Sequence, residues 1–402
     1  MKTSFLFLSA GISASIPSTG AEEAQESLPE DISREISEAS EAGQPRLFDI
    51  TERWAEARRK LEKELGFGWT ASYHGVALGA LGGDGVPVGA SGDFTVQGVW
   101  APGHRWTDNP TELRFRLRQR HAYAHTSASE LGPEIGALWG VVDGYSNSGF
   151  EIPDFYLRHD FERAGIELRY GQMTIDSQFA GHQLASSKKY FLNQAFSANP
   201  AVAFPRFGAG LTLVKEFDNG LSIGFGTTTV QGTQSGDQVD LEFGSRDLFQ
   251  ALQFSYKYKG RDDLGRRLLL LGWRSDAVSD ALQPEGQGVQ FIYERALDEA
   301  GTRLFSTLAW AEGGAAPLDY FLAAGIGRPC GEHDFGGLAI GMGRGSDSEH
   351  EFQAVFEAFY RWSPRENVQI TPDLQLLVGE GFTGGPGIRV VGVSMERGAA
   401  MH

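Results

Sequence analysis

The sequence has little that could cross-link the chain or catalyse a reaction. Cys330 is the one cysteine in 402 residues, so no intrachain disulfide can form. No His-Glu-x-x-His, Gly-x-Ser-x-Gly or phosphate-loop pattern occurs, and no histidine spacing fits a metal site. These absences predict a protein that is not an enzyme and that holds no metal or cofactor.

Two further absences concern the membrane and the charge. The chain has no run of about 18 apolar residues, which is the length of a transmembrane helix. Basic residues are the minority, with 35 Lys and Arg against 52 Asp and Glu and a net charge of −17. A strongly acidic chain is a poor partner for nucleic acid, so we expect none.

The N-terminal part of the chain predicts three segments. Residues 1–21 have a basic start, a short apolar run and then small residues, which is typical of a secretory signal peptide. Residues 22–46 form an acidic tail with too little apolar surface to fold alone. Within residues 47–66, Asp49 opens a capping box before an amphipathic stretch. We therefore expect one short α-helix there.

After this helix the pattern changes to short alternating runs between turn residues. Glycine accounts for 53 residues and aromatics for 11% of the chain. Polar and apolar side chains alternate in 253–259 and 369–375, which is the two-residue period of a strand with unlike faces. Residues 218–220, Asp-Asn-Gly, are typical of a tight turn. We predict an all-β domain over 67–396, with 397–402 as a C-terminal extension.

A closed barrel suits this domain better than a soluble sandwich. A sandwich of this length normally divides into two or more domains, yet no linker divides the chain. Closing a sheet removes its edges and lets strands be added without a larger core. At about 20 residues per strand and connection, the length gives about sixteen strands. We therefore predict a transmembrane antiparallel β-barrel of about 16 strands, with the short N-terminal α-helix at its periplasmic mouth.

The clearest strand, residues 111–121, has an apolar face and a basic face. Leu113, Phe115 and Leu117 alternate with polar side chains along it. The polar face carries one acid and four arginines, Glu112, Arg114, Arg116, Arg118 and Arg120. One explanation is a soluble sheet with a basic outer face. In a barrel, the apolar residues would face lipid and the arginines would line the lumen and make it locally positive. The rest of the chain favours the barrel.

Six more polar residues have a strand parity that would direct them into the same lumen. They are Arg158, Asp160, Glu357, Arg361, Asp373 and Gln375. Such residues can contact solute or can only brace the wall as ion pairs, and the sequence leaves both roles open. Tryptophans near strand ends suit the interfacial girdles of a barrel, although a lumenal indole would also stack on a sugar. These tryptophans are Trp100, Trp106, Trp139, Trp273, Trp310 and Trp362.

Two stretches, 189–232 and 325–380, carry motifs in an ordered series. The motifs are Phe191-Leu192-Asn193, Gly327-Arg328-Pro329, Glu357-Ala358-Phe359-Tyr360 and Ile370-Thr371-Pro372-Asp373-Leu374-Gln375. Together they resemble the carbohydrate-selective porins of Gram-negative outer membranes. Two features depart from the expected pattern. A Gly-Gly-Pro turn at 384–386 replaces the family's Asn-Pro turn, and residues 395–402 lack the terminal aromatic residue of outer-membrane barrels.

The resemblance implies a porin of the bacterial outer membrane. In such a protein, sugars or similar small hydrophilic solutes diffuse through a water-filled lumen, here lined by the arginine ladder, and the outside contacts outer-membrane lipid. The sequence leaves the oligomeric state open. Two alternatives from other classes also stay open: an outer-membrane hydrolase with its site at the barrel rim, and a structural barrel that tethers the envelope through the acidic tail.

Overall fold

The computed structural model describes most of the chain beyond the N-terminal segments. The described residues are 11–12, 60, 64–82, 87–102, 111–232, 236–242, 247–278, 283–346, 352–365, 368–382, 387–392 and 395–397. The predicted signal peptide, acidic tail and N-terminal helix therefore lie almost wholly outside the described residues, as does most of the predicted C-terminal extension.

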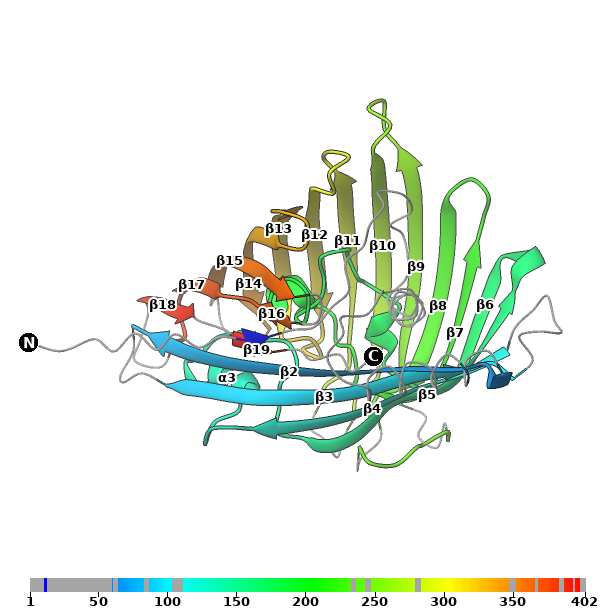
Figure 1. Cartoon of the computed structure of the whole chain (residues 1–402), viewed down its shortest axis with the longest axis horizontal. Coiled ribbons are helices and arrows are strands. Elements are labelled where there is room, and N and C mark those ends of the chain that lie inside the picture. Colours follow the sequence, from blue (N-terminus) through cyan, green and yellow to red (C-terminus); the bar gives the residue numbers. More distant parts are fainter. Residues whose placement is uncertain are drawn as a thin grey trace, which may run out of the picture.

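Antiparallel strands form one closed barrel (Figure 1). In chain order they are β2 (Phe67–Leu81), β3 (Val88–Trp100), β4 (Thr111–Ala122), β5 (Gly149–Phe161), β6 (Ile166–Met173), β7 (Gly208–Glu216), β8 (Leu221–Thr229), β9 (Leu248–Lys259), β10 (Gly265–Ser275), β11 (Gly286–Ala296), β12 (Arg303–Glu312), β13 (Leu318–Pro329), β14 (Phe335–Gly345), β15 (Phe352–Arg365), β16 (Val368–Ile370), β17 (Asp373–Gly379) and β18 (Gly387–Gly392). β18 pairs with β2 and closes the ring. β15 pairs with both β16 and β17, which act as one strand broken at Pro372, because proline has no N–H to donate. The barrel therefore has sixteen strands, and the predicted fold class is confirmed.

The connections differ in length between the two ends of the barrel. The turns at 162–165 and 217–220 are short and lie at one end, called here the short-turn end. In the second turn, which the sequence predicts, Phe217 N–H donates to the carbonyl of Leu221 at 2.9 Å. Gly220 has φ +84°, a conformation that glycine adopts without a Cβ clash. Longer connections lie at the opposite, long-loop end.

Short helical pieces lie in the connections. They are η1 (Ala128–Glu130), α3 (Leu131–Glu134), η2 (Glu162–Ala164), η3 (Ile175–Ser177) and α4 (Gln194–Ser197). A two-residue strand, β1 (Gly11–Ile12), pairs in parallel with β19 (Met395–Arg397). Within the described residues, none of the helices has the length and apolar character needed to span a membrane.

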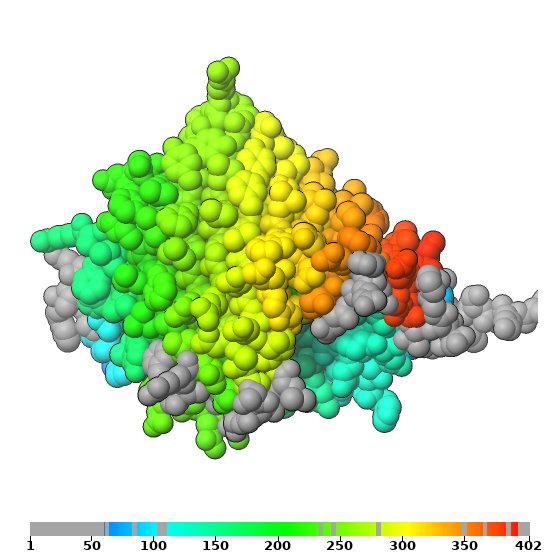
Figure 2. Space-filling model, turned by 180° about the vertical axis from the view of Figure 1, so that it is seen from behind, coloured from blue at the N-terminus to red at the C-terminus, as the bar shows by residue number. Residues whose placement is uncertain are grey.

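The outer face of the barrel is an apolar belt. On β14, Leu338 and Ile340 are exposed, Ile340 to 60%, whereas Ala339 between them is buried. The same alternation recurs around the ring, and Figure 2 shows the strands from behind as a continuous outer surface. A sheet that exposes its large apolar side chains outward is stable where the outside meets lipid.

The tryptophans divide between the two faces. Three of them are exposed near strand ends, where a girdle would lie: Trp100, Trp310 and Trp362. Trp139 and Trp273 are only 3% and 4% exposed, so the girdle prediction is wrong for these two. The indole N–H of Trp139 donates to Asn193 Oδ1 at 2.8 Å, which gives the buried donor its acceptor. Trp106 lies outside the described residues.

Two long connections fold into the barrel, and the second crosses its interior (Figure 1). The first inserted segment is residues 123–148, between β4 and β5, and the second is residues 174–207, between β6 and β7. Together with the wall they form an apolar core whose large members include Leu131, Trp139, Tyr145, Phe191, Phe196, Phe305, Phe321 and Phe359. A separate core packs residues of the second segment against β9, β10 and β11.

Wall glycines make room for the inserted phenylalanines. A Cβ placed on Gly337 would lie 2.9 Å from the ring of Phe191, and one on Gly341 would lie 3.1 Å from the ring of Phe196. Both glycines alternate with the exposed leucine and isoleucine of β14, so they face inward. Much of the inner wall is therefore packed with apolar side chains, and a dense row of ion pairs lies on β3 to β6.

Candidate solute pathway

The arginines of β4 lie on the inner face of the barrel. Leu113 pairs with Trp100 of β3 and with Leu157 of β5, and both of these partners are exposed on the outer belt. Arg114 has the opposite parity and is buried. Because side chains alternate along a strand, Arg116, Arg118 and Arg120 share the inward direction of Arg114, and Leu113, Phe115 and Leu117 point outward.

Each arginine of the ladder is paired with a carboxylate. The ion pairs are Arg114–Glu112 at 2.9 Å, Arg116–Asp154 at 2.6 Å, Arg118–Glu151 at 2.7 Å and Arg120–Asp93 at 2.9 Å. Further along the same wall, Arg158 pairs with Asp160 at 2.7 Å and with Glu167 at 2.6 Å. Positive and negative charges thus alternate over this wall, and the locally positive lumen expected from the sequence stays a prediction.

A bulge brings two of these acids to the ladder. Glu151 and Asp154 are three residues apart on β5, so a regular strand would turn one of them outward. The pairing of β4 with β5 shifts register between Arg116 and Arg118, and after this shift both acids oppose arginines. A bulge of this kind re-aims side chains locally, and no pattern in the sequence indicated it.

The second inserted segment adds a cation to the same wall. Lys188 Nζ lies 3.1 Å from Asp93 Oδ1 and 3.2 Å from Thr95 Oγ1. Burial lowers the pKa of Lys188, and the nearby Arg120 and Arg118 act in the same direction, whereas Asp93 opposes them. The inserted segment is thus joined to the arginine ladder by a shared carboxylate.

Two carboxylates of the inserted segments also face the ladder. Asp143 of the first segment is half-buried and Asp176 of the second is exposed. Burial raises the pKa of Asp143, and Arg120 and Arg118 lower it in part. The surrounding protein raises the pKa of Asp176 to about 6. Burial is the main cause of this rise, Asp143 and Asp154 act in the same direction, and Arg116 opposes it.

Another part of the wall holds the inserted segments through buried polar groups. Glu357 and Gln375 are 0% exposed. The backbone N–H groups of Leu192 and Asn193 donate to the Glu357 carboxylate at 2.6 and 3.0 Å. Asn193 Nδ2 donates to Gln375 Oε1, and Gln375 Nε2 donates to the carbonyl of Val141, both at 2.9 Å. Motif residues far apart in the sequence thus meet in one network.

The remaining sequence candidates belong to this anchoring region. Asp373 is buried and accepts a hydrogen bond from Gln375 at 3.2 Å. Arg361 Nη1 donates to the carbonyl of Lys189 at 2.7 Å. The contacts of Glu357, Arg361, Asp373 and Gln375 favour an anchoring role, and direct contact with solute stays a prediction for them. Glu112, the four ladder arginines, Arg158 and Asp160 gather instead on the polar wall.

Sequence reasoning missed six acids and one lysine at the polar wall, among other charged residues. They are Asp93, Asp143, Glu151, Asp154, Glu167, Asp176 and Lys188. The inward direction of Asp93 could have been predicted, since it lies on a strand with alternating side chains beside the arginine strand. The directions of the residues in the inserted segments could not, because irregular segments have no period that tells inside from outside.

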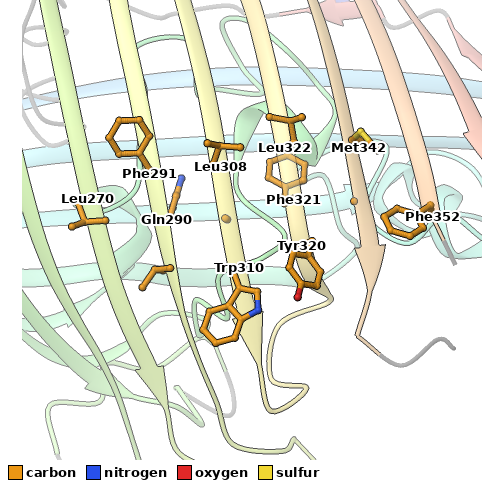
Figure 3. Close-up of a pocket in the computed structure, with 13 residues that line it drawn as sticks. Leu270, Gln290, Phe291, Leu308, Trp310, Tyr320, Phe321, Leu322, Met342 and Phe352 are labelled. Atoms are coloured by element: carbon orange, nitrogen blue, oxygen red, sulfur yellow. The ribbon is translucent and has the colours of Figure 1, made fainter. Parts of the chain in front are cut away.

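An apolar groove of about 430 Å³ lies on the outer face, away from the ladder (Figure 3). Leu308, Trp310 and Leu322 are among the side chains that line it. Its lining belongs to the outer belt, which would contact lipid in a membrane barrel. It is therefore not a site for a hydrophilic solute.

A closed sixteen-stranded barrel with loops folded into its interior has the fold of the porins. Among solved structures, the high-pH structure of Pseudomonas putida OprB matches 86% of this chain and 97% of its own, with a TM-score of 0.71 and 12% identity. The low-pH structure of the same protein has a TM-score of 0.56 at 11% identity, covering 87% of this chain and 97% of its own. A variant of the Rhodopseudomonas blastica porin has a TM-score of 0.50 at 9% identity, covering 82% and 99%. No family model and no curated protein sequence matches the chain.

Proposed function

We propose that this chain is an outer-membrane porin through which sugars or similar small hydrophilic solutes diffuse passively. The observation that carries the proposal is the wall of paired charges on β3 to β6, which faces inserted segments inside a closed barrel. No energy source is needed, because selectivity in such a channel follows from its width and its lining groups.

The chemistry of this wall suits neutral polyols. Arg116 is 24% exposed in its ion pair with Asp154, so it keeps contact with the water in the pathway. A guanidinium has five donors and a carboxylate about four acceptor positions, so one ion pair leaves groups free to meet hydroxyls. Compensated charges also avoid a strong preference for ions of one sign. The motif resemblance to carbohydrate-selective porins supports the same class of solute.

The outer surface supports a membrane location. An apolar belt with tryptophans near the strand ends suits a hydrocarbon layer with two interfaces. In barrels of this class short turns lie on the periplasmic side, so the short-turn end would be periplasmic and the inserted segments would enter from outside. The lipid of the outer membrane is then the partner of the belt.

Swelling of proteoliposomes in a panel of mono- and oligosaccharides tests this function. Vesicles that contain the protein should swell at rates that fall with increasing sugar size, whereas protein-free vesicles should not swell. Failure to swell in every sugar, with correctly folded protein in the vesicles, would contradict a diffusion channel. A chain lacking residues 22–46 should still support swelling, whereas an envelope tether would lose its attachment.

A further inference from the structure

Two arginines lie directly opposite each other on the outer face of the barrel, beside the short turn between β9 and β10. Arg266 of β10 and Arg295 of β11 are cross-strand partners. They have the strand parity of Leu270 and Phe291, which are exposed on the apolar belt, so both point outward. Like charges in such a position repel each other. One carboxylate, that of Asp262, pairs with both, at 2.9 and 2.8 Å.

The arginine pair keeps charge and donors that Asp262 does not match. Among the described residues, Asp262 is the one acid that pairs with either arginine, and only Nη2 of each guanidinium donates to it. The Nε–H groups of both arginines have no acceptor in the same part of the chain. A guanidinium has five donors. Two cations and one anion therefore leave one excess positive charge, with most of the donors unused.

Tyrosines flank the arginine pair. Tyr258 of β9 is the other cross-strand partner of Arg266, and its ring stacks on that of Tyr256 with the centroids 5.5 Å apart. The next outward-facing row, toward the middle of the belt, is Tyr256, Leu268 and Tyr293. Tyrosine is enriched where the hydrocarbon of a bilayer meets its headgroups. In a membrane the arginine pair would therefore lie at the headgroup level of one leaflet.

The apolar groove of the outer belt begins on the same strands. Leu270, Phe291 and Leu308 are among the residues that line it (Figure 3). Leu270 lies four residues beyond Arg266 on β10, which is about 13 Å along a strand. One leaflet provides about 15 Å of hydrocarbon. A lipid with its phosphate on the arginine pair can therefore lay an acyl chain into the groove.

We propose that Arg266 and Arg295 bind the phosphate of an anionic phospholipid, of the phosphatidylglycerol kind, in the leaflet at the short-turn end, with one acyl chain in the groove. The lipid supplies the second anion that the arginine pair lacks. A zwitterionic phospholipid fits less well, because its choline cation would face the excess positive charge. The inference rests on the membrane location proposed above, and it does not depend on the passage of solute.

Native mass spectrometry of the purified protein in a neutral detergent, with equal amounts of dioleoyl phosphatidylglycerol and dioleoyl phosphatidylcholine, tests the site. The wild type should retain phosphatidylglycerol in preference. Each arginine near a headgroup contributes about fivefold to the binding of an anionic lipid, so Arg266→Gln or Arg295→Gln should lower the preference by that factor. The double variant should remove it.

The matched control is Arg274→Gln. Arg274 has the same outward parity on β10 but lies at the opposite end of the strand, with its side chain 62% exposed. It therefore removes the same charge from the same face, away from the proposed headgroup position. This variant should retain phosphatidylglycerol like the wild type.

A gain-of-binding variant separates lipid binding from folding. Asp262→Asn removes the carboxylate that competes with the lipid phosphate for both arginines, and it keeps an acceptor oxygen for the backbone N–H of Leu264. Its preference for phosphatidylglycerol should exceed that of the wild type, a result that misfolding cannot produce.

Equal retention of the two lipids by the wild type, an unchanged preference in the double variant, or no gain in Asp262→Asn would each overturn the inference. Oligomers that exclude the lipid would also overturn it, since they would assign the groove to a second copy of the chain. A protein that folds into vesicles of neither lipid would contradict the proposed membrane location, and this inference with it.

Discussion

Charged side chains in the interior act differently according to what surrounds them. Arg116 and Asp154 form an ion pair in which the arginine keeps contact with water, so its groups could meet a solute in the proposed pathway. Glu357 is fully buried and caps two backbone N–H groups of the second inserted segment. Buried donors without acceptors are costly, so this carboxylate is required for the position of the segment.

Replacing Glu357 with alanine should therefore weaken the barrel and loosen the inserted segment. The N–H groups of Leu192 and Asn193 would lose their acceptors, and each unsatisfied buried donor costs about 1–3 kcal/mol. We expect a lower urea midpoint in detergent and a noisier channel current. Glu357→Gln keeps one acceptor oxygen and should cost less.

The matched control is Glu332→Ala, which removes an exposed carboxylate in the turn between β13 and β14. This variant should unfold like the wild type. Equal stability for Glu357→Ala and Glu332→Ala would show that the buried cap does not hold the segment.

At the level of elements, the strands were predictable and the inserted segments were not. Apolar and polar side chains alternate along β4, beginning with Leu113 and Arg114. This alternation is so regular that the two faces of the strand follow from the sequence alone. The register shift beside Arg116 was not visible, because a bulge depends on the partner strand. The inserted segments have no periodicity, so Trp139 and Asn193 gave no sign that they meet inside the barrel.

Two glycine variants test the packing between the second inserted segment and β14. Gly337→Ala would place a Cβ against the rings of Phe191 and Phe359, and overpacking of this kind typically costs about 1–3 kcal/mol. Gly272→Ala on β10 meets nothing within 4 Å and should be neutral or slightly stabilising. Urea unfolding in detergent compares the two. If Gly272→Ala were the more damaging, the packing described for β14 would be wrong.

In the whole molecule, the outer belt consists of apolar side chains, whereas the interior contains charged side chains. A charge at Ile340, in the middle of the outer face of β14, would meet hydrocarbon in a membrane barrel, at a cost of about 2–4 kcal/mol for lysine. Ile340→Lys should therefore lower the yield of folding into lipid vesicles. Glu299→Lys, in a short turn, should fold like the wild type. Equal yields for the two variants would place the belt outside the hydrocarbon.

The central claim is that solute passes along the wall of paired charges, and sugar block of the single-channel current tests it most directly. In a planar bilayer, the wild-type protein should give stepwise currents that fall as a disaccharide is added. Replacing Arg116, Arg118 and Arg120 together with Gln should weaken this block and shift selectivity toward cations, because three positive charges are removed from the wall while its carboxylates remain. A silent wild-type barrel, or a block and selectivity unchanged in the triple variant, would contradict the account.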